Sequence, residues 1–117
     1  MNKAIWALRI GVAGEFLGHG IFAIQGKEGW FKYFTSFGIS NPETITTILL
    51  VVGIMDVLLA LLVLLKPMKL PLLWMTFWGL WTALVRWPFG PDPIWDFVER
   101  FANWAAPLAL YYIYKDR

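Results

Sequence analysis

A glutamate and a histidine stand four positions apart in GVAGEFLGHG, residues 11–20, within a stretch that is otherwise apolar. Positions i and i+4 share one face of an α-helix, so Glu15 and His19 are predicted to point the same way. A carboxylate beside an imidazole suits proton exchange or hydrogen bonding to a polar ligand. Placing both groups in apolar surroundings is costly, which favours a function or an internal partner for the pair.

Other charged groups recur within the remaining apolar stretches or at their edges. With Glu15 they form a set whose formal charges sum to zero: Arg9, Asp56, Arg86, Glu99 and Arg100. Because arginine binds carboxylates through two parallel hydrogen bonds, we expect the inner arginines to pair with the inner carboxylates. Arg9 is expected to snorkel to the nearby membrane surface, and Arg100 to pair with Asp96 one turn earlier.

Helical phase places these polar residues beside small ones. Gly11 and Gly18 share the face of Glu15 and His19, and glycine on a membrane helix marks where a neighbouring backbone comes close. Each apolar stretch is therefore predicted to turn its polar group toward the bundle interior. The predicted ligand or proton site consists of Glu15, His19, Asp56, Arg86, Glu99 and Asn103. Pro107 lacks an N–H, so it is expected to leave the Asn103 carbonyl free beside this site.

A second interpretation of the same cluster is a buried polar network that only fixes helix register, and the sequence leaves both interpretations open. No metal site is predicted, because one histidine with carboxylates is a poor set of transition-metal ligands. The absence of cysteine excludes disulfides, thiolate metal sites and iron–sulfur ligation, and a single histidine excludes an intrachain bis-histidine haem. No covalently bound cofactor is implied.

The elements that must position these residues follow from composition. The 117 residues are 59% hydrophobic with a mean hydropathy of +0.60, which is more apolar side chain than a soluble domain of this length can bury. Four stretches, near 4–25, 44–65, 70–87 and 93–114, approach the roughly 20 residues that cross a hydrocarbon core. The predicted fold is an all-α membrane protein, a single domain over 1–117 built as an antiparallel four-transmembrane-helix bundle. The net charge of +2 does not favour a nucleic-acid partner.

Local signals mark where the predicted helices begin. In SNPET, Ser40 or Asn41 can serve as N-cap with Pro42 at the first helical position. In PDPIW, Asp92 and Pro93 repeat this arrangement. KPMKLP, residues 66–71, is predicted to be the tight turn between the second and third spans.

The positions of lysine and arginine predict the orientation in the membrane. With the N-terminus inside, most cations near the membrane lie on the inner side: Lys3, Lys66, Lys69, Lys115 and Arg117. Both termini are therefore predicted to be cytoplasmic, in a bacterial inner membrane.

Aromatic residues mark two further places. The first outer connection, GKEGWFKYFTSFG, is predicted to contain a short interfacial helix that anchors the chain in the membrane surface or gates a substrate. Trp74, Trp78 and Trp81 form a stripe that either faces lipid or lines a pocket.

Three segments carry a resemblance to a known family. LRIGVAGEFLGHGIFAI resembles the first helix of DoxX-like membrane proteins, YFTSFGISNPE is similar to their outer connection, and GIMDVLLALLVL resembles their second helix. Arg9, His19, Gly20 and Asp56 match the family pattern. The chain departs from it in having Asp56 where glutamate is expected and Ala23 where many relatives carry lysine. The resemblance implies a four-helix membrane protein associated with quinol-oxidising or sulfur-oxidising membrane complexes.

Three classes of function remain open, and the sequence does not decide whether the chain is an enzyme. The first is a quinone-binding or redox-complex-associated component, which would hold quinone without a covalent bond. The second is a non-catalytic accessory subunit of a larger membrane complex. The third is a small proton or small-molecule transporter, which the apolar inner half of the bundle disfavours. Each class implies the lipid bilayer and either other membrane proteins or further copies of the chain as partners.

Overall fold

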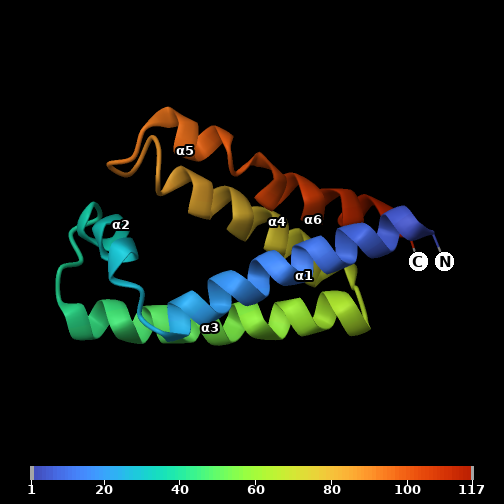
Figure 1. Ribbon diagram of the computed structural model, residues 1–117, viewed down its shortest axis with the longest axis horizontal. Helices are drawn as coiled ribbons and strands as arrows, with labels where there is room; N and C mark the ends of the chain where they lie inside the picture. Colours follow the sequence, from blue (N-terminus) through green and yellow to red (C-terminus); the bar gives the residue numbers. More distant parts are fainter. Residues whose placement is uncertain (1, 117) are drawn as a thin grey trace.

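The computed structural model describes residues 2–116, and all the regular structure in that range is helical (Figure 1). The segments are α1 (Lys3–Ile24), η1 (Glu28–Trp30), α2 (Phe31–Thr35), α3 (Pro42–Leu65), α4 (Lys69–Leu84), α5 (Ile94–Val98) and α6 (Phe101–Tyr114). The all-helical prediction is confirmed for these residues. Arg117, which was counted among the inner cations, lies outside them.

Two helices are long and apolar enough to cross a membrane. They are α1, with 22 residues, and α3, with 24, at the places of the first two predicted spans. The other two long helices are shorter, since α4 has 16 residues and α6 has 14.

The predicted helix over 93–114 is wrong as a continuous element. A turn at Glu99 and Arg100 separates α5 from α6, and Arg100 leaves helical geometry with φ −97° and ψ 10°. The predicted helix over 70–87 also stops early, at Leu84. Beyond it the chain folds back on itself, and the Asp92 amide bonds to the Arg86 carbonyl oxygen at 3.0 Å.

The long helices form two pairs, α1 with α3 and α4 with α6, each held by a glycine that lets two backbones approach. A Cβ on Gly53 would lie 2.6 Å from the Gly20 carbonyl oxygen, and one on Gly79 would lie 2.7 Å from the Asn103 carbonyl carbon. Both distances are too short for a side chain to fit. The expectation that Gly11 and Gly18 mark the close approach is wrong, because both face open space.

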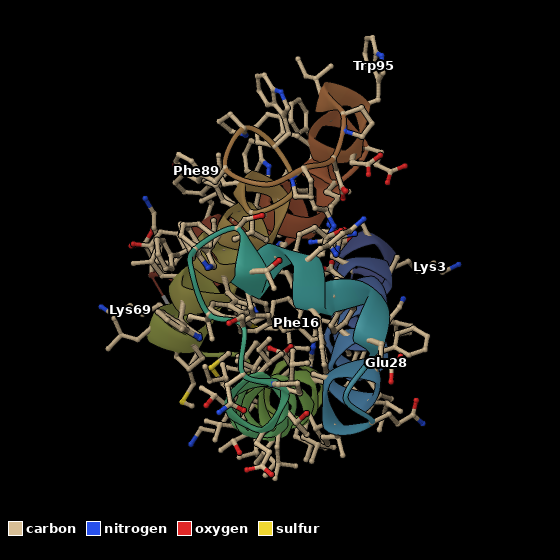
Figure 2. All side chains as sticks on the ribbon, turned by 90° about the vertical axis from the view of Figure 1, so that its left-hand side faces the viewer. Lys3, Phe16, Glu28, Lys69, Phe89 and Trp95 are labelled. Atoms are coloured by element: carbon tan, nitrogen blue, oxygen red, sulfur yellow. The ribbon has the colours of Figure 1, made fainter. Side chains whose placement is uncertain are left out.

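The two pairs form a wedge. They lie close together at the end that holds both termini and the α3–α4 turn, and they separate toward the end that holds α2 and α5 (Figure 1). A core of apolar side chains fills the region where the pairs meet: Val12, Ala13, Phe16, Leu59, Ala60, Val63, Leu72, Met75 and Leu110. At the wide end, α2 crosses between the pairs (Figure 2).

Local signals explain the start of α3 and the end of α1, but not the start of α5. Asn41 accepts a hydrogen bond from the Glu43 amide at 2.9 Å, with Pro42 in the first turn, which confirms the predicted start of α3. The prediction that Asp92 caps the last span is wrong, since α5 begins at Ile94 without a side-chain cap. Gly26 ends α1 in the left-handed region, at φ +68°, and Gly38 adopts φ +85° after α2.

Candidate functional site

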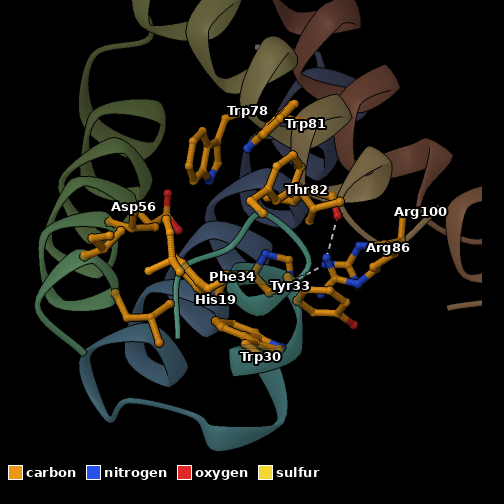
Figure 3. Close-up of a pocket in the computed structure, with 16 residues that line it drawn as sticks. His19, Trp30, Tyr33, Phe34, Asp56, Trp78, Trp81, Thr82, Arg86 and Arg100 are labelled. Atoms are coloured by element: carbon orange, nitrogen blue, oxygen red, sulfur yellow. Dashed lines mark hydrogen bonds between the residues drawn. The ribbon is translucent and has the colours of Figure 1, made fainter. Parts of the chain in front are cut away.

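A cavity of about 330 Å³ lies at the wide end of the wedge, between the two helix pairs. Its lining is mostly apolar, with a few charged side chains (Figure 3). The residues that line it are His19, Trp30, Tyr33, Phe34, Phe37, Ile39, Ile48, Leu49, Val52, Asp56, Trp78, Trp81, Thr82, Val85, Arg86 and Arg100. We call this cavity the wide-end pocket.

Residues 27–37, here called the cover segment, close one side of the pocket with aromatic side chains. They contribute Trp30, Tyr33, Phe34 and Phe37 to its lining. These residues share helical spacing, in agreement with the short helix predicted for this connection, and they point inward to the pocket.

The tryptophan stripe of α4 divides between two environments. Trp78 and Trp81 line the pocket, whereas Trp74 is 41% exposed and stacks on Trp78 with ring centroids 5.9 Å apart. The pocket alternative therefore holds for Trp78 and Trp81, whereas Trp74 lies at the outer surface of α4.

Asp56 supplies the acidic side of the pocket. The residue is only 2% exposed, and its Oδ1 atom has no hydrogen-bond partner among residues 2–116. It is held there because Gly20 has no side chain: a Cβ on Gly20 would lie 3.2 Å from the Asp56 Cβ. The His-Gly pair thus places an imidazole on one side of α1 and admits Asp56 on another.

His19 interacts with Arg100, which lies at the start of α6. The Arg100 Nη2 atom lies 2.9 Å from His19 Nε2. Since a guanidinium can only donate, Nε2 accepts, and the ring proton sits on Nδ1. The imidazole also makes a T-shaped contact with Trp30, with ring centroids 5.8 Å apart. The expected pairing of Arg100 with Asp96 is wrong, because the guanidinium turns into the pocket instead.

Arg86 follows the last turn of α4 and is 8% exposed. Its Nη1 donates to the Thr82 carbonyl oxygen, and its Cζ lies 4.7 Å from the centroid of the Tyr33 ring. No carboxylate of residues 2–116 forms an ion pair with Arg86 or Arg100. The prediction that these arginines pair with inner carboxylates is therefore wrong: their partners are a carbonyl, an aromatic face and an imidazole.

A cluster at the edge of the pocket fastens the cover segment to the loop after α4. The Tyr33 hydroxyl donates to Asp92 Oδ2 at 2.6 Å, and Lys32 Nζ lies 2.8 Å from Asp92 Oδ1. We call Lys32, Tyr33 and Asp92 the Asp92 clasp. The hydrogen bond to Asp92 raises the pKa of Lys32. Burial raises the pKa of Asp92, but the hydrogen bonds from Lys32 and Tyr33 outweigh it and leave the pKa below its ordinary value.

The structure divides the predicted site. It brings His19, Asp56 and Arg86 together in the wide-end pocket. Glu15 and Asn103 line a separate recess between α1 and α6, whereas Glu99 is exposed and lines neither cavity.

Arg9 lies at the narrow end of the wedge, far from the wide-end pocket. It is 5% exposed, so the expectation that it snorkels is wrong. Its Nε donates to the Val63 carbonyl oxygen at 2.9 Å, and its Nη2 donates to that of Leu64. Arg9 thus caps the C-terminal end of α3, where the free carbonyls and the helix dipole favour a cation.

Sequence reasoning missed Arg100, Thr82 and the clasp as parts of the site. Tyr33 could have been found from the sequence, because it is one of the helically spaced aromatic residues of the first outer connection. Asp92 gave no such signal, because its position before a proline is equally typical of a helix cap. Among residues 2–116, no three metal-ligating side chains come together as a metal site.

Comparison with known proteins does not assign a family. The chain matches no family model, no curated protein and no solved structure.

Proposed function

We propose that the chain is a DoxX-like inner-membrane protein whose wide-end pocket binds a ligand of the quinone class. In this proposal α1, α3, α4 and α6 cross the bilayer as an antiparallel bundle. The termini and the α3–α4 turn are cytoplasmic, and α2 lies in the outer interface. The protein would act beside a redox enzyme of the same membrane, since the described residues offer no redox centre.

The membrane part of the proposal is supported by apolar side chains that face outward. Ile10, Val51, Leu58, Leu65 and Leu70 are each more than half exposed, on helices of both pairs. Lipid would cover such a surface, which soluble monomers rarely carry. The 16 residues of α4 rise about 24 Å, which is short for a hydrocarbon core of about 30 Å but is tolerated when the bilayer thins locally.

The observation that carries the proposal is the combination of flat apolar walls and convergent donors in one cavity. Trp78 and Trp81 offer flat surfaces that an aromatic or quinoid ring can contact. Arg86 and Arg100 point hydrogen-bond donors into the same space, and a quinone presents carbonyl oxygens that accept from such donors. The volume of about 330 Å³ lies at the lower end of ordinary ligand pockets, which favours a single ring.

Calorimetric titration of the purified protein with duroquinone, a tetramethyl benzoquinone, tests the proposal. We expect saturable binding at one site per chain, weakened at least several-fold by Trp81→Leu through loss of the ring contact. Trp95→Leu is the matched control, because Trp95 is 70% exposed and lies outside the pocket. Absence of binding, or equal affinities in the two variants, would contradict the proposal.

A second candidate function is that of an accessory subunit that packs against another membrane protein. The observation that favours it is the outward face of α1, where Gly11, Gly14 and Gly18 have no atom of another residue near their Cβ positions. Gly14 and Gly18 form the G-x-x-x-G spacing that lets two membrane helices approach. Gly14→Leu should then abolish co-purification of a partner after mild extraction while leaving duroquinone binding intact.

A further inference from the structure

We infer that the wide-end pocket selects the reduced, hydroquinone form of its ring ligand over the quinone. The inference rests on the proposed function and adds to it the oxidation state of the ligand. It follows from two polar sites on opposite walls of the pocket, one that lacks a donor and one that lacks an acceptor.

The first polar site is Asp56, on α3. Asp56 is only 2% exposed and lines the pocket, yet its Oδ1 receives no hydrogen bond from residues 2–116. A buried acceptor without a donor costs free energy, and a ligand hydroxyl would satisfy it. A quinone carbonyl offers no donor and would set one oxygen against another.

The second polar site is the pair Arg86 and Arg100, on the α4–α6 side. The Arg100 Nε–H is buried and has no acceptor among residues 2–116, and neither guanidinium has a carboxylate partner there. A ligand oxygen would accept from these donors. The oxygen of either ring form can accept such a hydrogen bond, so the preference for the reduced form comes from Asp56.

The two sites face each other across the apolar space. Asp56 belongs to the α1–α3 pair and the arginines to the α4–α6 side, with His19 and Tyr33 between them (Figure 3). Thr82 has no free donor for a quinone carbonyl, since its hydroxyl already donates to the Gly79 carbonyl oxygen at 2.9 Å. A ring with oxygens at opposite ends, lying against Trp78 and Trp81, would satisfy both walls at once.

The test compares three ligands with one ring: duroquinone, its hydroquinone and the dimethyl ether of that hydroquinone. Titrations of the intact protein are made anaerobically, so that the hydroquinone stays reduced. A hydrogen bond from the ligand hydroxyl to the buried Asp56 oxygen predicts that the hydroquinone binds about five-fold tighter than the quinone. The dimethyl ether keeps the reduced ring but has no donor for Asp56, so it should lose this advantage.

Two substitutions assign the preference to Asp56. Asp56→Leu has a similar shape and no acceptor. This variant should bind the hydroquinone only as tightly as it binds the dimethyl ether. Asp56→Asn can donate to a carbonyl, and it should move the preference toward the quinone. Glu99→Gln is the control, since that carboxylate lies outside the pocket, and it should keep the wild-type preference.

The outcomes separate this inference from the proposed function. If the wild type binds duroquinone as tightly as its hydroquinone, the inference fails and the proposed function stands. If neither ring form binds, both fail. Should Asp56→Leu misfold, the three-ligand comparison on the wild type still decides.

Discussion

Gly79 provides the sharpest test of how α4 and α6, which form one side of the wide-end pocket, pack together. It lies in the second half of α4, where it meets the backbone of α6. A Cβ at this position would lie 2.7 Å from the Asn103 carbonyl carbon, closer still to its oxygen, and 3.1 Å from the Trp104 nitrogen. All these atoms belong to a helix backbone, which cannot turn aside as a flexible side chain can.

The size of the effect follows from that geometry. To reach ordinary contact at 3.4 Å, the Cβ–carbon distance must lengthen by roughly 0.7 Å, so α4 and α6 must separate. Overpacking of this kind costs typically about 1–3 kcal/mol, and a rigid neighbour favours the upper end of that range. Alanine recovers about 1 kcal/mol of helix propensity, which leaves a net loss of about 2 kcal/mol for Gly79→Ala.

Unfolding in detergent micelles, followed by far-UV circular dichroism during denaturant titration, measures this difference. The matched control is Gly14→Ala, because a Cβ on Gly14 meets no atom within 4 Å. We expect the control to be as stable as the wild type or more stable. If Gly79→Ala proves as stable as Gly14→Ala, the backbone contact between α4 and α6 is not as close as described.

Three further predictions concern other parts of the chain. A cysteine introduced at Ser36 should react with a membrane-impermeant thiol reagent in intact cells and one at Lys69 should not, and the reverse result would invert the proposed topology. Arg9→Met should lower the free energy of unfolding by about 2–3 kcal/mol, because it removes charged donors from buried carbonyls; the exposed Lys3→Met should change it by no more than about 0.5 kcal/mol. Because the pKa of Asp92 is lowered in the folded protein, the clasp should contribute stability in full above the ordinary carboxyl pKa of about 3.9 and lose it as the pH falls through the lowered value. Asp92→Asn should flatten this acid dependence of the denaturation midpoint, and an unchanged profile would show that Asp92 does not govern it.

Signals carried by single helices were predictable from the sequence. The lengths of α1 and α3 follow from apolar stretches that are long enough to be recognised without knowledge of their neighbours. The start of α3 follows from Asn41 and Pro42, whose preferences act within one turn. Neither prediction required long-range information.

The division of the predicted site was not predictable in this way. Helical phase placed Glu15 and His19 on one face of α1, but two neighbouring helices share that face. Which neighbour meets which residue depends on where the helices cross, and α1 crosses α3 at Gly20, two residues beyond Gly18. Glu15 therefore opens toward α6, whereas His19 lines the pocket.

The hydrogen-bond partners of the arginines could not be predicted from the sequence for a different reason. A search for opposite charges finds carboxylates, but Arg9 binds the carbonyls of Val63 and Leu64, and Arg86 binds a carbonyl and the face of Tyr33. Carbonyl groups occur at every residue, so their availability at a helix end becomes visible only in the folded chain.

The glycines at the two ends of the cover segment bear on how fast a ligand could come and go. Gly26 and Gly38 both adopt positive φ, and the last carbonyls of α1 are already bonded to the Gly26 and Lys27 amides. The cover segment is also held by apolar contacts of Trp30, Phe31 and Phe34 with α1 and α3, so the dwell time of a ligand would depend on these contacts together with the Asp92 clasp. Loosening the clasp should speed entry and exit together while leaving the equilibrium affinity almost unchanged, because the same barrier stands in both directions.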